Sequence, residues 1–355
     1  ATRVNSQGLI EDITSNLPRI DYTGGEGHWL FEPQSTNLET ESAALTTGWN
    51  VRTGATSQIQ TSTTPFGVSG NVYKLTNATN NPPSWTDNSN STKKQYAVSA
   101  TDPASFYTFS VYVKSAGSTT INIQLRDNSR GSFVTTGLIS LSSEWQRVTI
   151  SKQFTTSTTA VGVVIAGTDG DILLADAQFE QQSFATSYIP TNGSTVTRLK
   201  DAAFGAGNSS LINSTEGVLY VEVAALAEQT LTRYITLSSG ASSNRIIIYI
   251  TDVGVIKFFV GVGGVTQAAK TVSGQTTTNF NKLAVSYKEN DIKFYLNGVK
   301  VHTDTSASTF PADTLNVLNF AASNGTSSPF FGKTKCAAVF KEALTDAELT
   351  CLTTI

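Results

Sequence analysis

The chain has 355 residues, of which 14% are charged, and its formal net charge at pH 7 is −3. Such a balance presents no basic field to a phosphate backbone, which argues against a nucleic-acid partner. No apolar run approaches the roughly 20 residues that cross a bilayer, so membrane insertion is not expected either. Methionine is absent and Ala1 opens the chain, so we expect a fragment or a processed product.

Residues 1–38 carry isolated apolar side chains, such as Leu9, Ile13 and Leu30, separated by polar and turn-forming residues. This spacing has neither the period of a helix nor that of a strand. We therefore predict an extended N-terminal segment over residues 1–38 that packs on a neighbouring domain.

Residues 39–190 show short strand patterns separated by turn signals. In the clearest strand, residues 107–114, the side chains of Tyr107, Phe109, Val111 and Val113 share one face. Similar patterns recur over residues 121–126, 145–150, 161–166 and 172–179. Their cadence is typical of an antiparallel β-sandwich of the jelly-roll type.

The stretch from Asp176 to Asp201 is interpreted as the junction between two β-rich domains. Pro190 and Gly193 mark a turn within it, and residues 191–197 form the predicted linker. Tyr188 and Ile189 give the junction apolar surface to bury, so we expect it to be short and packed.

Residues 198–355 repeat the cadence of short strands. Strands are predicted over 218–224, 234–237, 245–250, 255–260, 283–287, 292–296 and 299–301. Asn297-Gly298 is a strong hairpin signal, and Thr345 stands at capping-box spacing before a terminal helix. The predicted fold class is all-β, with two antiparallel β-sandwich (jelly-roll) domains in tandem and a short C-terminal helix.

No catalytic constellation is recognisable in the sequence. A Glu-x-Asp-x-x-Glu strand would supply two carboxylates on one face, but the nearest match begins at Glu289 and has Phe294 in place of the third acid. His28 and His302, the only histidines, lack a nucleophile elbow nearby, and we interpret both as surface residues. We expect no enzymatic activity.

The sequence leaves a metal ion and a disulfide undecided. Asp169, Asp171 and Asp176 are either oxygen ligands of a structural Ca²⁺ or ordinary turn aspartates. Cys336 and Cys351 either form a disulfide at the C-terminus or are two small buried residues. No other cofactor is expected.

Candidate glycan-binding residues lie in the first predicted sandwich. If strands 107–114 and 121–126 pair, their outward face offers Tyr112, Asn122, Gln124 and Arg126, which combine an aromatic ring with hydrogen-bonding groups. The alternative is an ordinary solvated sheet face.

Two further aromatic residues, Trp85 and Tyr96, lie in and after a turn-rich loop. The sequence leaves three interpretations of Trp85 open: it contacts a sugar, it contacts another subunit, or it covers the core. Trp49 and Trp145 are interpreted as core residues.

The chain also resembles known families. The segment from Val339 to Leu349, with Tyr295-Leu-Asn-Gly-Val299, resembles the laminin-G/concanavalin-like lectin fold over roughly 155 residues. Residues 109–114, 144–147 and 175–180 look like a carbohydrate-binding-module jelly roll. The lead-in segments of residues 3–38, together with Ser187-Tyr-Ile-Pro-Thr191, look like bacteriophage tail- and head-fibre proteins.

This resemblance implies a virion-surface fibre or tail-tip component, often a trimer, that binds host cell-surface polysaccharide and other virion proteins during adsorption. One alternative is a purely structural spacer or decoration of the virion. Another is a pair of accessory glycan-binding modules of a secreted bacterial polysaccharide-degrading enzyme. The homotrimer rests on the resemblance, because the sequence itself contains no heptad repeat that would indicate a coiled coil.

Overall fold

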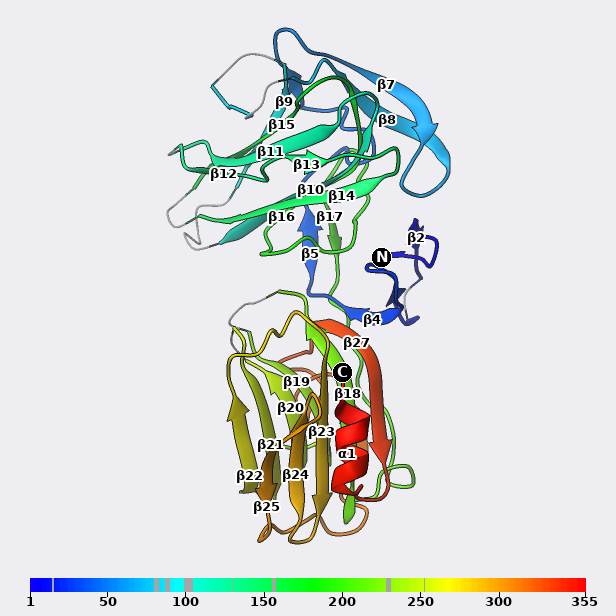
Figure 1. Cartoon of the computed structure of the whole chain (residues 1–355), viewed down its shortest axis with the longest axis vertical. Coiled ribbons are helices and arrows are strands. Elements are labelled where there is room, and N and C mark those ends of the chain that lie inside the picture. The colour runs from blue at the N-terminus through cyan, green and yellow to red at the C-terminus, as the bar shows by residue number, and fades with distance from the viewer. Residues whose placement is uncertain are drawn as a thin grey trace. The chain divides into compact units, whose positions relative to one another are not determined.

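The computed structural model describes all residues except 15, 80–82, 87–89, 99–104, 130, 155–157, 228–230 and 252. The chain divides into two compact units (Figure 1). Unit 1 contains Ala1–Leu17, Tyr22–Gly25 and Gln34–Leu199, and unit 2 contains Pro18–Asp21, Glu26–Pro33 and Lys200–Ile355. The structure thus divides the first 38 residues between both units.

Unit 1 is a sandwich of two antiparallel sheets. One sheet has the order β14-β10-β16-β8-β7, and the other has the order β12-β11-β15-β9-β6 with β13 also paired to β11. The first sheet comprises β7 (Thr56–Thr63), β8 (Ser69–Thr76), β10 (Phe106–Ser115), β14 (Gln146–Gln153) and β16 (Ile172–Glu180). The second comprises β6 (Asn50–Val51), β9 (Thr92–Ala97), β11 (Thr120–Asp127), β12 (Phe133–Thr135), β13 (Ile139–Ser140) and β15 (Ala160–Gly167).

The core of unit 1 lies between these sheets. Phe109, Val111 and Val113 enter it from β10, and Ile123 and Val163 enter from β11 and β15. Two small ladders complete the unit: β1 (Thr2–Val4) pairs with β2 (Ile10–Asp12), and β5 (Ser35–Asn37) pairs with β17 (Val196–Arg198).

The outer face of β16 is covered by polar chain rather than by solvent. Glu180 accepts hydrogen bonds from the Ser35 hydroxyl (2.5 Å) and the Thr186 amide (2.9 Å), and Gln178 accepts one from the Ile189 amide (2.7 Å). Gln178 and Glu180 are both fully buried. These hydrogen bonds offset the cost of burying the polar side chains of Gln178 and Glu180.

Unit 2 is a second antiparallel sandwich. Its larger sheet has the order β25-β24-β23-β18-β27-β4-β3, and its smaller sheet has the order β22-β21-β20-β19-β26. The larger sheet comprises β3 (Ile20–Asp21), β4 (His28–Phe31), β18 (Glu216–Ala225), β23 (Asn281–Lys288), β24 (Ile292–Leu296), β25 (Val299–Asp304) and β27 (Gly332–Phe340). The smaller comprises β19 (Arg233–Ser238), β20 (Arg245–Ile250), β21 (Ile256–Val262), β22 (Val265–Val272) and β26 (Val317–Asn319).

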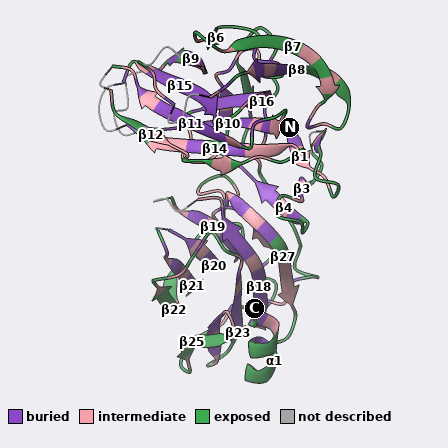
Figure 2. Cartoon of the chain, turned by 45° about the horizontal axis from the view of Figure 1, so that its top comes forward, coloured by how far each residue is buried: buried purple, intermediate pink, exposed green. Residues whose placement is uncertain are grey.

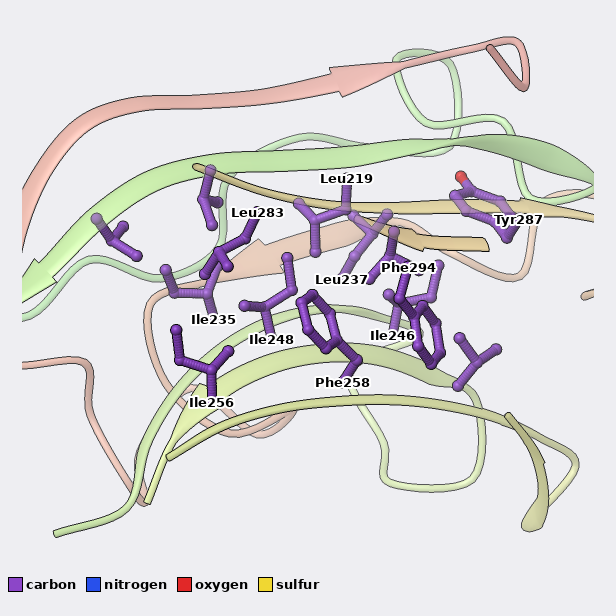
Figure 3. Close-up of a cluster of buried hydrophobic side chains, with 14 of the residues drawn as sticks. Leu219, Ile235, Leu237, Ile246, Ile248, Ile256, Phe258, Leu283, Tyr287 and Phe294 are labelled. Atoms are coloured by element: carbon purple, nitrogen blue, oxygen red, sulfur yellow. The ribbon is translucent and has the colours of Figure 1, made fainter. Parts of the chain in front are cut away.

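The core of unit 2 is aliphatic and aromatic (Figure 3). Phe258 of the smaller sheet stacks on Phe294 of the larger sheet, with ring centroids 5.2 Å apart. Exposed residues gather on β7 of unit 1 and β22 of unit 2, where residues of both strand faces are exposed (Figure 2). Asn297 and Gly298 have φ angles of 49° and 81°, which a tight hairpin of this kind requires.

Strands β3 and β4 belong to unit 2 although they come from the N-terminal segment. β4 pairs with β27, and its Phe31 ring stacks on Phe320 at 5.0 Å. Arg19, next to β3, is buried and forms ion pairs with Glu32 and Asp201.

Helix α1 (Asp346–Thr353) begins at Thr345 in a capping box, because the Thr345 hydroxyl accepts from the Glu348 amide and the Glu348 carboxylate accepts from the Thr345 amide. Its Leu349 is fully buried in a small cluster with Val218 and Tyr220 on the outer face of the larger sheet.

The structure confirms the all-β fold class, the short terminal helix and the predicted strands. Two expectations are wrong. His28 is buried at 3% exposure rather than lying on the surface, because β4 lies between β27 and β3. Cys336 and Cys351 are free and exposed, so they neither form a disulfide nor fill the core. No helix among the described residues is long and apolar enough to cross a membrane.

Candidate functional site

Trp85 lies over the outer face of the six-stranded sheet of unit 1. A Cβ atom added at Gly162 of β15 would lie 2.6 Å from the Trp85 ring, so only glycine leaves room for the indole at this position. Lys93 of β9 also contacts the residue, with its Nζ 4.3 Å from the ring centroid and 3.1 Å from the Trp85 carbonyl oxygen. The indole is half-buried and therefore still offers part of its surface to solvent.

Strand alternation places polar side chains around this ring. Arg126 of β11 is opposite Gly162 in the ladder, and Gly162 is in turn opposite Gln95 of β9. The Asn128 amide donates to the Gln95 side chain at 2.8 Å. The Trp85 patch, defined as Trp85, Lys93, Gln95, Arg126 and Asn128, thus combines an aromatic surface with amides and cations.

Three buried polar atoms at this surface, two acceptors and one donor, lack hydrogen-bond partners among the described residues. The Asn128 Oδ1 and Arg126 Nε atoms are buried and have no hydrogen-bond partner among the residues that the structure describes. Gln124 is 3% exposed; its Nε2 donates to the Pro83 carbonyl at 2.8 Å, while its Oε1 is also without a partner. Unpartnered buried polar atoms are costly, and a hydrogen-bonding ligand is one way to satisfy them.

The patch has an excess of positive charge. Burial lowers the pKa of Lys93, and the neighbouring guanidinium groups of Arg52 and Arg126 lower it further. Neither Lys93 nor Arg126 forms an ion pair in the described part of the chain. The patch is therefore better suited to a ligand with oxygen acceptors or negative charge than to a cationic one.

The structure brings together only part of the predicted set. Trp85 and Arg126 lie in the patch, whereas Asn122 and Gln124, at 4% and 3% exposure, do not form the solvated polar face that was assumed. The Gln124 side chain donates to the Pro83 carbonyl and thereby anchors the loop that carries Pro83 and Trp85.

The assumed pairing of the two central strands is wrong. β10 pairs with β14 and β16 and β11 pairs with β12, β13 and β15, so Tyr112 belongs to the opposite sheet. Arg147, rather than any patch residue, lies near it, 5.7 Å from its ring. Opposite sheets of a sandwich present their outer faces in opposite directions, which separates Tyr112 from the patch.

Tyr96 points into the core rather than toward a ligand. Its ring stacks on Phe179 at 4.2 Å, and its hydroxyl donates to Glu39 at 2.7 Å. Trp49, predicted as a core residue, packs against the same core and donates its Nε1–H to Glu39. Trp145 instead packs on a small cluster on the outer face of the other sheet.

The candidate calcium ligands have protein partners and do not converge. Asp169 accepts from the Thr119 amide at 2.9 Å, Asp171 pairs with Lys74 at 2.9 Å, and Asp176 is buried in β16. Within the described residues, no group of three His, Cys, Asp or Glu side chains is arranged to hold a metal ion.

Sequence reasoning missed Lys93, Gln95 and Asn128, which come from β9 and the turn after β11. The signal that could have found them is the alternation in Thr92-Lys-Lys-Gln-Tyr-Ala97, which places Lys93 and Gln95 on one face. Gly162, between two valines, was a second signal, because a glycine inside a strand often marks a close approach.

The family match to known proteins lies within unit 2. A family model described as the concanavalin A-like lectin/glucanases superfamily matches residues 220–350. This match supports the lectin-like interpretation of the second half of the chain. No curated protein sequence matches the chain.

Among solved structures, the chain is similar to the CBM40 module of the Ruminococcus gnavus IT-sialidase bound to α2,3-sialyllactose, at 18% identity and a TM-score of 0.36 over 44% of this chain and 97% of that one. It is similar to domain 4 of the arabinanase AbnA from Geobacillus stearothermophilus bound to arabinotriose, at 18% identity and a TM-score of 0.32 over 48% and 81%. A pentraxin from Limulus polyphemus follows at 11% identity and a TM-score of 0.33 over 41% and 72%.

Proposed function

We propose that the chain is a non-enzymatic glycan-binding protein and that the Trp85 patch is one of its binding surfaces. The observation that carries this proposal is the half-buried Trp85 ring, held over Gly162 by Lys93 and bordered by Arg126 and Gln95. An aromatic surface contacts the C–H face of a sugar ring, while amides and guanidinium groups bind its hydroxyls. The lectin-type family match of unit 2 supports the same class of function.

A glycan array probed with the purified chain tests this proposal, with Trp85→Ala as the diagnostic variant. We expect binding to fall at least tenfold, because the variant removes the aromatic contact and leaves the sheet beneath it intact. Phe106→Ala is the matched control, since Phe106 is also partly exposed, at 37%, but lies on β10 of the opposite sheet. Equal loss in both variants would show that Trp85 has no specific role.

The absence of catalysis is tested on the glycans that bind. Incubation of the chain with each bound polysaccharide should release no new reducing ends over a day. The non-enzymatic proposal would be contradicted if new reducing ends were still released after the protein had been chromatographed again, and if substitution of one carboxylate residue abolished this release.

We further propose that this binding serves adsorption of a bacteriophage to host cell-surface polysaccharide, with the chain at the virion surface as part of a fibre or tail tip. The fibre-type segments at residues 3–38 and 187–191 support this role by resemblance. Host-cell binding by the folded chain is the test, and absence of binding to both cells and glycans would leave a structural spacer as the better account.

The same surface would serve equally well in accessory modules of a secreted polysaccharide-degrading enzyme. The coding sequence upstream of Ala1 separates the two roles, because one predicts a virion-anchoring stem and the other a catalytic domain. Light scattering on the purified chain tests whether it forms the trimer that the resemblance implies.

A further inference from the structure

The outer face of the smaller sheet of unit 2 carries a strip of aromatic and basic side chains. Because Ile235, Ile246, Ile248 and Phe258 point into the core, the residues between them point outward. The ladder places Tyr234 opposite Tyr249 and Tyr249 opposite Lys257 in one row. In the next rows it places Phe259 opposite Ile247, and Arg245 opposite Gly261.

The rings of this strip lie close together. Tyr234 and Tyr249 meet edge to face with centroids 5.0 Å apart, and the Arg245 guanidinium lies 5.2 Å from the Phe259 ring. A Cβ atom at Gly261 would lie 2.8 Å from Phe259, so the glycine allows this ring to lean over the strand. We call the five partly exposed residues Tyr234, Tyr249, Phe259, Arg245 and Lys257 the Tyr–Arg face.

The charge of this sheet differs from that of the whole chain. Its five strands contain Arg233, Arg245, Lys257 and Lys270 but no aspartate or glutamate, although the chain has a net charge of −3. Arg245 and Lys257 form no ion pair within the described residues, and the buried Arg245 Nε has no hydrogen-bond partner there. The two outward cations are therefore available to an anionic ligand.

The two tyrosine hydroxyls add hydrogen-bonding capacity to the strip. Burial raises the pKa of Tyr249, and the neighbouring Tyr234 raises it further. The Tyr249 hydroxyl thus stays protonated at neutral pH and can both donate and accept hydrogen bonds.

We propose that the Tyr–Arg face binds an acidic saccharide, with Arg245 engaging the sugar carboxylate and Tyr249 and Phe259 contacting its C–H surface. A guanidinium group binds a carboxylate through two parallel hydrogen bonds, which a neutral sugar cannot match. An extended peptide would need an unpaired strand edge, and a nucleic acid would need a longer track of cations. This inference deepens the proposed glycan-binding function by naming a ligand class, and it uses a surface in a different unit from the Trp85 patch.

The test compares two probes that differ only in charge: an oligogalacturonate and its carboxyl-reduced neutral counterpart. We expect the full chain carrying Trp85→Ala, which removes the first surface, to bind the acidic probe at least tenfold more tightly. Adding Arg245→Ala should abolish this preference, and Arg245→Lys should restore only part of it because lysine cannot form the paired hydrogen bonds. Tyr249→Ala should weaken binding of both probes.

Lys288→Ala serves as the matched control, because Lys288 is exposed and lies on the other sheet of the same unit. Thermal unfolding verifies that each variant is folded. Equal binding of the two probes, or an unchanged preference in Arg245→Ala, would overturn the inference. The single variant Arg245→Ala, which retains Trp85, reports on glycan binding at the Trp85 patch alone. A loss of binding at the Trp85 patch can therefore be distinguished from a loss of binding at the Tyr–Arg face.

Discussion

Glu39 is a buried carboxylate on which three side chains of unit 1 converge. Its oxygens accept from the Lys94 ammonium at 2.6 Å, the Tyr96 hydroxyl at 2.7 Å and the Trp49 indole N–H at 3.2 Å. We expect Glu39→Ala to lower the free energy of unfolding of unit 1 by about 3–5 kcal/mol, because Lys94 would remain a buried cation without its partner. Denaturant unfolding measures the change.

The control for this prediction is Glu144→Ala, which removes an exposed carboxylate and should change the free energy of unfolding by about 0.5 kcal/mol or less. The double variant Glu39→Leu/Lys94→Met removes both charges and should be more stable than Glu39→Ala alone. If Glu39→Ala matched the Glu144→Ala control, the cluster would contribute nothing to stability.

Asp176 predicts a pH dependence of stability. Burial raises its pKa from 3.8 to about 7, against the opposing effects of Tyr188 and Arg147, and its Oδ2 has no hydrogen-bond partner among the described residues. The folded state therefore prefers the protonated carboxyl, and this preference stabilises the fold fully below pH ~4 and is lost as the pH rises through ~7. The stability of Asp176→Asn relative to the wild type should therefore increase between these values, by up to roughly 4 kcal/mol.

Unfolding curves from pH 4.5 to 7.5 test this prediction. Asparagine tolerates the φ angle of 53° at this position, so the variant adds little backbone strain. Asp169→Asn is the control, because the pKa of Asp169 is shifted in the opposite direction: the Thr119 amide lowers it. The stability of Asp169→Asn relative to the wild type should therefore stay constant over this pH range. A flat profile for Asp176→Asn as well would mean that Asp176 is ionised in the folded state.

At the scale of residues, alternation predicts the direction of a side chain but not what covers it. Arg126 and Gln124 point outward as the pattern indicates, yet the loop around Pro83 buries Gln124. Ser110 also points away from the core and is nevertheless fully buried, because polar chain covers its sheet. When a segment distant in the sequence buries an outward-facing side chain, the local alternation of residues around that side chain does not change. Such burial therefore cannot be predicted from the local sequence pattern.

At the scale of elements, β4 completes unit 2 from far away in the sequence. Its Phe31 lies in the core against Phe320, and its backbone pairs with β27. We expect residues 200–355 alone to unfold at a lower temperature than the same region in the full chain. A synthetic peptide of residues 18–33 should raise that temperature in a concentration-dependent manner, because it binds only the folded state.

The matched control is the same peptide with Phe31→Ala, which keeps the backbone but loses the buried ring. Its effect should be much weaker, since deletion of a buried phenylalanine side chain costs about 3–5 kcal/mol. If both peptides shifted the unfolding temperature equally, backbone pairing rather than the buried ring would be the source of the stabilisation.

Strands with strong apolar alternation, such as β10 and β23, are recognisable from the sequence. Others are not: β7 reads Thr-Ser-Gln-Ile-Gln-Thr-Ser-Thr and is mostly exposed, so pairing with β8 rather than burial holds it. β22 has the same character and, among the described strands, pairs with β21 alone. Such strands are stabilised by pairing with an adjacent strand, and the hydrophobic pattern of the sequence does not show which strand that is.

At the scale of the whole molecule, two surfaces on separate units predict two binding sites per chain. Calorimetric titration with a short acidic oligosaccharide should give a stoichiometry of two, which either Trp85→Ala or Arg245→Ala reduces to one. A long polymer that reaches both sites should bind more tightly than the short probe, because the second contact becomes intramolecular. A stoichiometry of two in the double variant would place the sites elsewhere.

The division of the first 38 residues between the units has a consequence for synthesis. Glu26 and its ion-pair partner Lys335 are 309 positions apart, so β4 leaves the ribosome long before β27 exists. At about 5–20 residues per second, the wait lasts on the order of tens of seconds. During that interval Phe31 lacks its core partners Phe320 and Phe330. A recombination event that exchanged only the second half of the gene would also separate unit 2 from its own β3 and β4, so the new second half would have to pair with edge strands of another origin.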